Sequence, residues 1–214
     1  SRVFQVESTA TDVSITGVTS RSPITITGGS LTTADADGGG ILISGATNLT
    51  LVHASVVSNS VADGDGGGVF AQAGTITLVA GTVAGNQAPA GFGGGVYVVN
   101  GSVVVRDNSH VDGNSALNIG GIGVNAGPSA SANAVQILNG SSASGNSSTA
   151  TVDAAAGNYG GGGVAVQGAG SVYVSRSQVS GNHTNGMYSA GILVTLGDVT
   201  VTNGSRINGN VNRG

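Results

Sequence analysis

The chain has 214 residues, of which only 7% are charged; glycine occurs 40 times, cysteine and lysine are absent, and the net charge is −4. The lack of cysteine excludes a disulfide framework. Nucleic acid is disfavoured as a partner, because six scattered arginines cannot neutralise a run of phosphates. No apolar run approaches the roughly 20 residues of a spanning helix, so we expect no direct insertion into a membrane.

The chain begins with a strand-like apolar run at residues 3–6. Residues 13–15 then lie 28 positions before residues 41–43, and residues 24–26 lie 25 positions before Leu49. This spacing predicts that residues 13–15 and 24–26 are the first and second strands of an opening coil.

From residue 38 onward three markers recur together. Glycine clusters lead into short apolar runs at residues 41–43, 69–71, 96–98, 122–124, 164–166 and 192–194. A second alternating run follows at residues 49–51, 76–78, 103–105, 135–137, 172–174 and 199–201. A third short element ends in asparagine, at Asn59, Asn86, Asn114, Asn146, Asn182 and Asn210, with separations of 27, 28, 32, 36 and 28 residues.

These periods are too long for a heptad, and the apolar runs alternate with period two. We therefore predict an all-β fold, a single right-handed parallel β-helix domain over residues 1–214 with about seven coils of three short strands. Two longer coils predict protruding loops near residues 125–133 and 147–158. Neither end shows a capping helix or a charged coil, so both ends are expected to be uncapped.

The asparagine column has two interpretations. Buried amides can stack along the axis as a hydrogen-bonded ladder. Alternatively, the six asparagines are separate turn residues that tolerate left-handed backbone. Neither role is catalytic.

Two D-x-D-G-G-G segments lie one coil apart and place Asp35, Asp37, Asp63 and Asp65 close together. Four neighbouring carboxylates repel one another unless something neutralises them. Calcium, which binds six to eight oxygen ligands, would suit this site. The alternative is two solvated acidic turns that splay apart.

Leu42, Phe70 and Tyr97 occupy equivalent outward positions on successive coils and form a possible ligand or partner surface. They could stack sugar rings, or they could lie under a loop or beside a neighbouring chain. Arg106 and Asp107 fall at an outward position and are expected to form a solvated surface pair. The three histidines fall at different points of the coil. We therefore expect no catalytic residues and no enzyme.

The GGG-[IV]-x-[IV] and x-G-N repeats resemble those of bacterial right-handed β-helix surface proteins, among them polymorphic outer membrane proteins and autotransporter-type passengers. Alanine of their GGA motif is replaced by glycine, and phenylalanine of their FxxN motif by Val56, Val83, Val111, Ala143, Val179 or Ile207. The resemblance implies an extracellular or cell-surface protein that is structural or adhesive. We expect a stalk segment that continues a longer β-helix, or a fibre subunit that associates end to end. The alternative is a β-helix that binds or cleaves carbohydrate, with glycans as partners.

Overall fold

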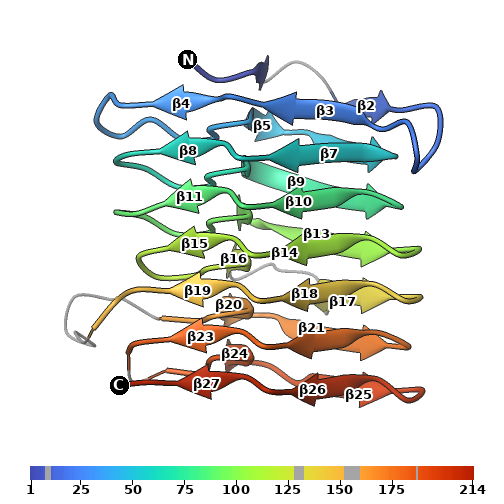
Figure 1. Cartoon of the computed structure of the whole chain (residues 1–214), viewed down its shortest axis with the longest axis vertical. Helices are drawn as coiled ribbons and strands as arrows, with labels where there is room; N and C mark the ends of the chain where they lie inside the picture. Colours follow the sequence, from blue (N-terminus) through green and yellow to red (C-terminus); the bar gives the residue numbers. More distant parts are fainter. Residues whose placement is uncertain (8–10, 128–132, 152–159, 187) are drawn as a thin grey trace.

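The computed structural model describes residues 1–7, 11–127, 133–151, 160–186 and 188–214, which form a stack of parallel coils (Figure 1). The described residues form strands and no helix. Strands on neighbouring coils pair in parallel, and the chain winds right-handed from the N-terminal to the C-terminal coil. The predicted fold class, an all-β parallel β-helix, is confirmed. The two predicted loops include residues 128–132 and 152–159, which lie outside the described residues.

Each coil presents four faces. The first face consists of β1 (Phe4–Val6), β5 (Ile41–Ala46), β9 (Val69–Val79), β12 (Val96–Val99), β16 (Ile122–Ala126), β20 (Val164–Ala169) and β24 (Ile192–Leu196). The second face consists of β2 (Asp12–Thr16), β6 (Asn48–Val52), the end of β9, β13 (Gly101–Arg106), β17 (Asn133–Leu138), β21 (Ser171–Ser175) and β25 (Val199–Thr202). Because β9 runs through both faces, the two join into one 13-stranded sheet.

The other two faces are separate seven-stranded sheets. The third face consists of β3 (Ile24–Thr27), β7 (Ala54–Val57), β10 (Thr82–Ala84), β14 (His110–Asp112), β18 (Ser142–Ser144), β22 (Gln178–Ser180) and β26 (Arg206–Asn208). The fourth face consists of β4 (Ser30–Leu31), β8 (Ser60–Val61), β11 (Gln87–Ala88), β15 (Ser115–Ala116), β19 (Ser147–Ser148), β23 (His183–Thr184) and β27 (Val211–Asn212). These two-residue strands follow the column asparagines, and the sequence pattern did not predict them.

The first coil is shifted by one face from its predicted alignment. Val13 pairs with Leu49 rather than Ile41, and Ile24 pairs with Ala54 rather than Leu49. The first-face strand of this coil is β1, in which Phe4 pairs with Ile41. The prediction was wrong because the corner between β2 and β3 spans residues 17–23, whereas His53 alone separates β6 from β7.

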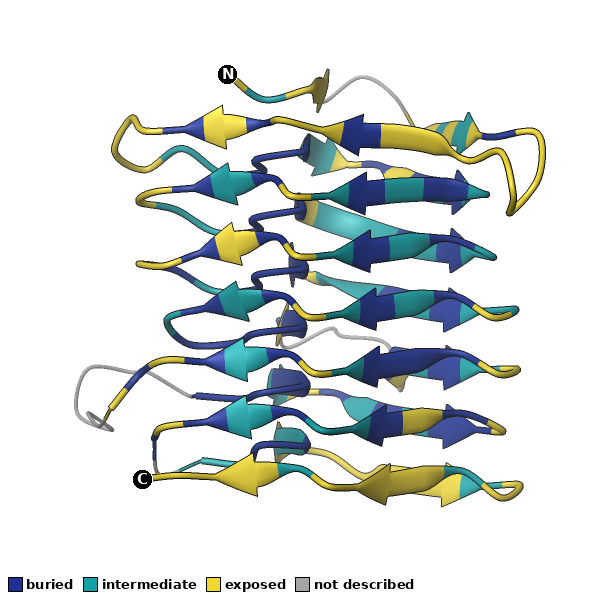
Figure 2. Ribbon diagram, viewed as in Figure 1, coloured by how far each residue is buried: buried dark blue, intermediate teal, exposed yellow. Residues whose placement is uncertain are grey.

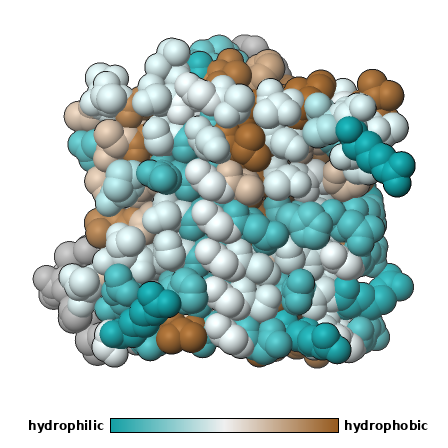
Figure 3. Space-filling model, viewed as in Figure 1, coloured by the Kyte–Doolittle hydropathy of each residue, from teal (hydrophilic) through white to brown (hydrophobic). Residues whose placement is uncertain are grey.

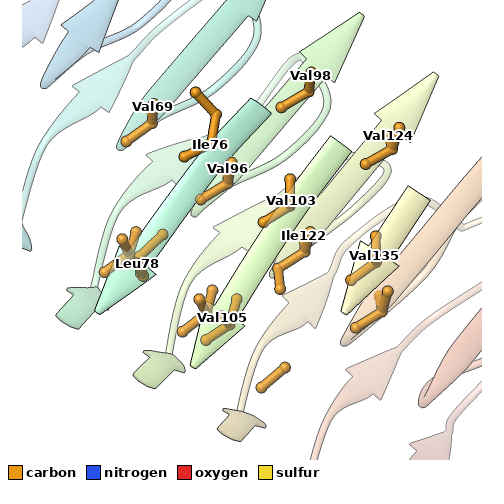
Figure 4. Packing of buried hydrophobic residues seen from close by; sticks show 14 of the residues in the cluster. Val69, Ile76, Leu78, Val96, Val98, Val103, Val105, Ile122, Val124 and Val135 are labelled. Carbon is orange, nitrogen blue, oxygen red and sulfur yellow. The ribbon is translucent and has the colours of Figure 1, made fainter. Parts of the chain in front are cut away.

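The core consists of apolar columns that run along the axis. Inward residues of the first face, such as Val69, Val96 and Ile122, are fully buried one above another, and Figure 4 shows this stacking beside the columns of the second face. Burial is lost in the end coils, as the yellow strands of Figure 2 show. No single coil could bury such columns alone, so stability depends on contacts between coils.

The six asparagines form a hydrogen-bonded ladder at the corner between the third and fourth faces. At each step the Oδ1 of one asparagine accepts from the backbone N–H and the side-chain Nδ2 of the asparagine one coil earlier. Asn114 Oδ1 lies 3.0 Å from Asn86 N and 2.9 Å from Asn86 Nδ2. The same pair of bonds joins every successive member from Asn59 to Asn210. The arrangement is a ladder of stacked amides, not six independent turns.

The last glycine before each first-face strand from β5 to β24 packs against this ladder. A Cβ added at Gly95 would lie 2.8 Å from Gly121 O and 2.9 Å from Asn114 Nδ2. Equivalent glycines on the other coils would place a Cβ 2.7–3.0 Å from their own ladder asparagine. Room for the amide therefore requires glycine here, which explains why the glycine and asparagine markers share one period.

We expect Asn114→Ala to lower the free energy of unfolding by about 3 kcal/mol or more, because it leaves several buried donors and acceptors without partners. Asn208→Ala is the matched control, since Asn208 is exposed in β26, and we expect a change within about 0.5 kcal/mol. Urea unfolding followed by circular dichroism measures both. Equal effects of the two substitutions would contradict a stabilising ladder.

Candidate functional site

The two D-x-D turns lie on neighbouring coils, at the corner that leads from the fourth face to the first. Ala36 N donates to Asp63 O at 3.2 Å, and Gly38 N donates to Asp65 O at 2.9 Å. Asp35 and Asp63 are exposed, whereas Asp37 and Asp65 are partly buried. All four carboxyl-bearing residues line one surface depression of about 270 Å³.

The two inner carboxylates bond to the backbone of the following coil. Asp37 Oδ1 accepts from Asp65 N at 2.8 Å, and Asp65 Oδ1 accepts from Phe92 N at 2.8 Å. Asp37, Asp65 and Phe92 thus form a column in which each carboxylate holds the next turn. One oxygen of each inner carboxylate is therefore already engaged by the protein.

Burial raises the pKa of the Asp65 carboxyl to about 6, against the opposing hydrogen bond from Phe92 and with an added contribution from the negative charge of Asp37. Burial also raises the pKa of Asp37, partly offset by the Asp65 amide and by Arg2. Burial is thus the main cause of both raised pKa values, and the negative charges of neighbouring aspartates add to it.

In the part of the chain that the structure describes, no three acidic, histidine or cysteine side chains are grouped so as to hold a metal ion. The calcium site at Asp35, Asp37, Asp63 and Asp65 stays a prediction. The structure shows that the two turns which carry these residues lie on neighbouring coils and line one depression.

The column of Leu42, Phe70 and Tyr97 is stacked as predicted by the repeat, but it is not an open strip. Phe70 and Tyr97 are only 6% and 4% exposed. Phe92 stacks on Tyr97 with ring centroids 5.4 Å apart, and with Ile119 these rings form a small second core outside the sheet. Of the alternatives given by the sequence, the structure supports a column that lies under a corner segment. Phe70 and Tyr97 are not available to stack sugar rings.

Arg106 and Asp107 form an ion pair whose side chains are 43% and 39% exposed. Such a pair contributes little to stability and offers no shielded chemistry. Arg176 lies on a later corner, where Nη2 donates to Asn139 Oδ1. The Asn139 side chain also donates to Asp107 Oδ1 at 3.0 Å, so it links the Arg106–Asp107 pair to Arg176 along one exposed corner.

A Ser–His–Asp cluster, which sequence reasoning missed, lies on the third face. Ser142 Oγ donates to Asp112 Oδ1 at 3.0 Å and lies 2.8 Å from His110 Nδ1. Because the hydroxyl has one proton, the His110 Nδ1–H must be the donor to Ser142. In a nucleophilic triad the histidine lies between serine and acid; here the serine lies between them and is 2% exposed. The cluster therefore forms hydrogen bonds that join two neighbouring coils.

The position of each residue relative to the ladder asparagines could have predicted that this cluster forms. His110 lies four residues before Asn114, and Ser142 lies four residues before Asn146, so the two residues are neighbours across one coil step.

A serine column between the second and third faces was also missed. Ser109, Ser141, Ser177 and Ser205 each accept from a backbone N–H one coil earlier.

The described residues include no helix long and apolar enough to cross a membrane. Comparisons with protein families, curated proteins and solved structures gave no match. The structure itself defines the chain as a parallel β-helix repeat protein.

We expect Asp65→Asn to be more stable than the original chain at pH 7.5 by about 1–2 kcal/mol, after allowance for partial exposure. The folded carboxyl, with its raised pKa, binds a proton more tightly than the unfolded one. Stability of the original chain therefore falls as pH rises from about 4 to about 6, and the advantage of the variant should vanish near pH 4.

Asp63→Asn, an exposed change on the same turn, is the control for the measurements without calcium and should have little effect there. Urea midpoints across this pH range, with and without added calcium, measure the difference. A less stable Asp65→Asn at pH 7.5 without calcium would contradict the raised pKa. A loss of stability that appears only with calcium would support the metal site.

Proposed function

We propose that this chain is a structural segment of an extracellular, cell-surface β-helix rather than an enzyme, and that adhesion is mediated by its outer faces. The repeats that resemble those of bacterial surface β-helix passengers support this type of protein. Two forms of the proposal remain from the sequence, a stalk segment that continues a longer β-helix and a fibre subunit that stacks on copies of itself.

The observation that carries the proposal is the exposed core at the edge formed by β24–β27. Inward side chains of this edge are 39–47% exposed at Val199, Val201 and Ile207. Their counterparts one coil earlier, Val172, Val174 and Val179, are fully buried. Ile192, Val199, Ile207 and Asn210 line a depression of about 630 Å³ there. A further rung would cover these side chains and pair the strand edges.

The polarity of the ladder favours a further coil of the stalk over self-stacking. Each ladder asparagine except Asn210 donates its backbone N–H to the Oδ1 of the next coil. At the opposite edge the same column holds Gly29, whose N–H donates to Asn59 Oδ1 at 2.9 Å. Head-to-tail stacking of copies in this register would place Gly29 on Asn210, and glycine has no side-chain acceptor. A coil with asparagine in this column would continue the ladder.

A carbohydrate-binding β-helix is the second candidate. It is favoured by one observation: among the described residues, Arg176 and Arg206 have no carboxylate within ion-pair distance.

We expect that a second copy of residues 187–214, appended after Gly214, raises the free energy of unfolding by about 2 kcal/mol or more, because it buries the exposed apolar columns. The matched control carries glycine in place of the copied Asn210, and we expect a smaller gain. Urea unfolding and sedimentation velocity measure stability and association.

Equal gains from the asparagine and glycine versions would contradict the ladder argument. Electron microscopy of the 214-residue chain provides an independent check. Long regular filaments would favour the self-stacking fibre over the stalk segment.

A further inference from the structure

A polar groove lies at the corner between the second and third faces, near the C-terminal coils. It has a volume of about 240 Å³ and is lined by Gly140, Ser141, Arg176, Ser177, Gln178, Gly204 and Arg206. The third face is in front in Figure 3, and hydrophilic side chains gather over its lower part. None of the lining residues has an apolar side chain.

The groove holds two of the six arginines of the chain, contributed by neighbouring coils. Arg206 is opposite Gln178 in the pairing of β22 with β26, and Arg176 precedes Gln178 by two residues. Both arginines are exposed. Among the described residues neither guanidinium has a carboxylate within ion-pair distance, since the ion pairs found there join Arg106 to Asp107 and His110 to Asp112. The groove is therefore locally cationic in a chain of net charge −4.

The groove lies where neighbouring corners differ in length. Arg176 has φ 51°, like the equivalent Asn139 and Asn203, but on those two coils an additional glycine, Gly140 or Gly204, follows the corner residue. A Cβ at Gly204 would meet nothing within 4 Å. Arg176 Nη2 donates to Asn139 Oδ1, which holds its guanidinium at the corner. No described side chain anchors Arg206 in this way.

We propose that the Arg176–Arg206 groove binds an anionic group of an acidic polysaccharide, a uronate carboxylate or a sulfate ester. The planar guanidinium donates two parallel hydrogen bonds to a carboxylate or a sulfate. The Gln178 amide adds donors and acceptors that match sugar hydroxyls. Protein partners require an apolar centre to their interface, which this groove lacks. Nucleic acid requires many more cations than two, together with aromatic stacking.

This inference does not depend on the proposed structural role, because a stalk segment and a fibre subunit would both present the groove. Its test uses the 214-residue chain and three immobilised polymers. Polygalacturonate offers carboxylates alone, dextran sulfate offers sulfates alone, and dextran is neutral. Binding at low salt is measured by surface plasmon resonance, with inorganic sulfate as competitor.

We expect binding to one or both acidic polymers and none to dextran. The double variant Arg176→Gln/Arg206→Gln should weaken binding by about tenfold or more, and each single variant by about threefold or more. The matched control is Arg106→Gln, because Arg106 ends β13 two coils earlier, does not line the groove and is paired with Asp107. It should bind within about twofold of the original chain. Circular dichroism and urea midpoints should be unchanged in all variants, since these side chains are exposed.

Absence of binding to both acidic polymers would overturn the proposal, as would binding that the double variant retains. An equal loss in Arg106→Gln would mean that general charge, rather than this groove, attracts the polymer. If inorganic sulfate competes at the same concentration as sulfate groups on the polymer, the groove is a small-anion site and the assignment to polysaccharide fails.

Discussion

The buried asparagine ladder is the interaction on which the rest of the stack depends. An amide in a dry interior needs partners for its carbonyl and its N–H groups, and leaving them unpaired is costly. Here each amide is paired with the asparagine one coil away, and its Nδ2 also donates to a backbone carbonyl of the preceding coil. If the pairing between two coils shifted by one residue, the amide groups of the ladder would lose their partners and the apolar side chains would point outward. The ladder thus sets the register, and the apolar columns and the glycines that make room for the amides follow from it.

This dependence explains why so much of the fold could be predicted from sequence. The separations of 27, 28, 32, 36 and 28 residues between asparagines are the separations of the hydrogen-bonded partners in the structure. Additional residues in the two longer coils leave the ladder intact, so the period can vary while the register holds. The first coil was misaligned where this marker is missing, because Gly29 occupies the ladder position and a seven-residue corner replaces the usual short one.

The candidate site could be predicted only where it follows the same register. Spacing placed the two acidic turns on neighbouring coils, but it could not reveal that Asp37 and Asp65 each accept from the next backbone amide. The alternation of inward and outward residues along the strands predicted that Phe70 and Tyr97 point away from the core. It could not predict whether a corner segment covers them. Phe92, which does so, precedes its glycine cluster as Asp37 and Asp65 precede theirs, but that position alone does not show that its ring turns toward Tyr97. The Ser142–His110 contact was present in the register and was missed because no motif joins residues 32 apart.

A stacked-coil fold also places unusual limits on charge. Equivalent positions lie about 4.8 Å apart along the axis, so a charged column brings like charges close together. This is consistent with a chain in which only 7% of residues are charged. Acidic residues in such a column can take up a proton, and the pKa values of Asp37 and Asp65 are raised, mainly by burial and to a lesser extent by neighbouring negative charge. Arginine cannot lose its charge in a protein. Arg176 and Arg206 line one groove, and no carboxylate of the described residues lies within ion-pair distance of either. An anion bound from outside would neutralise them. An anionic group on a polymer is better suited to this than a free ion, because the polymer adds further contacts.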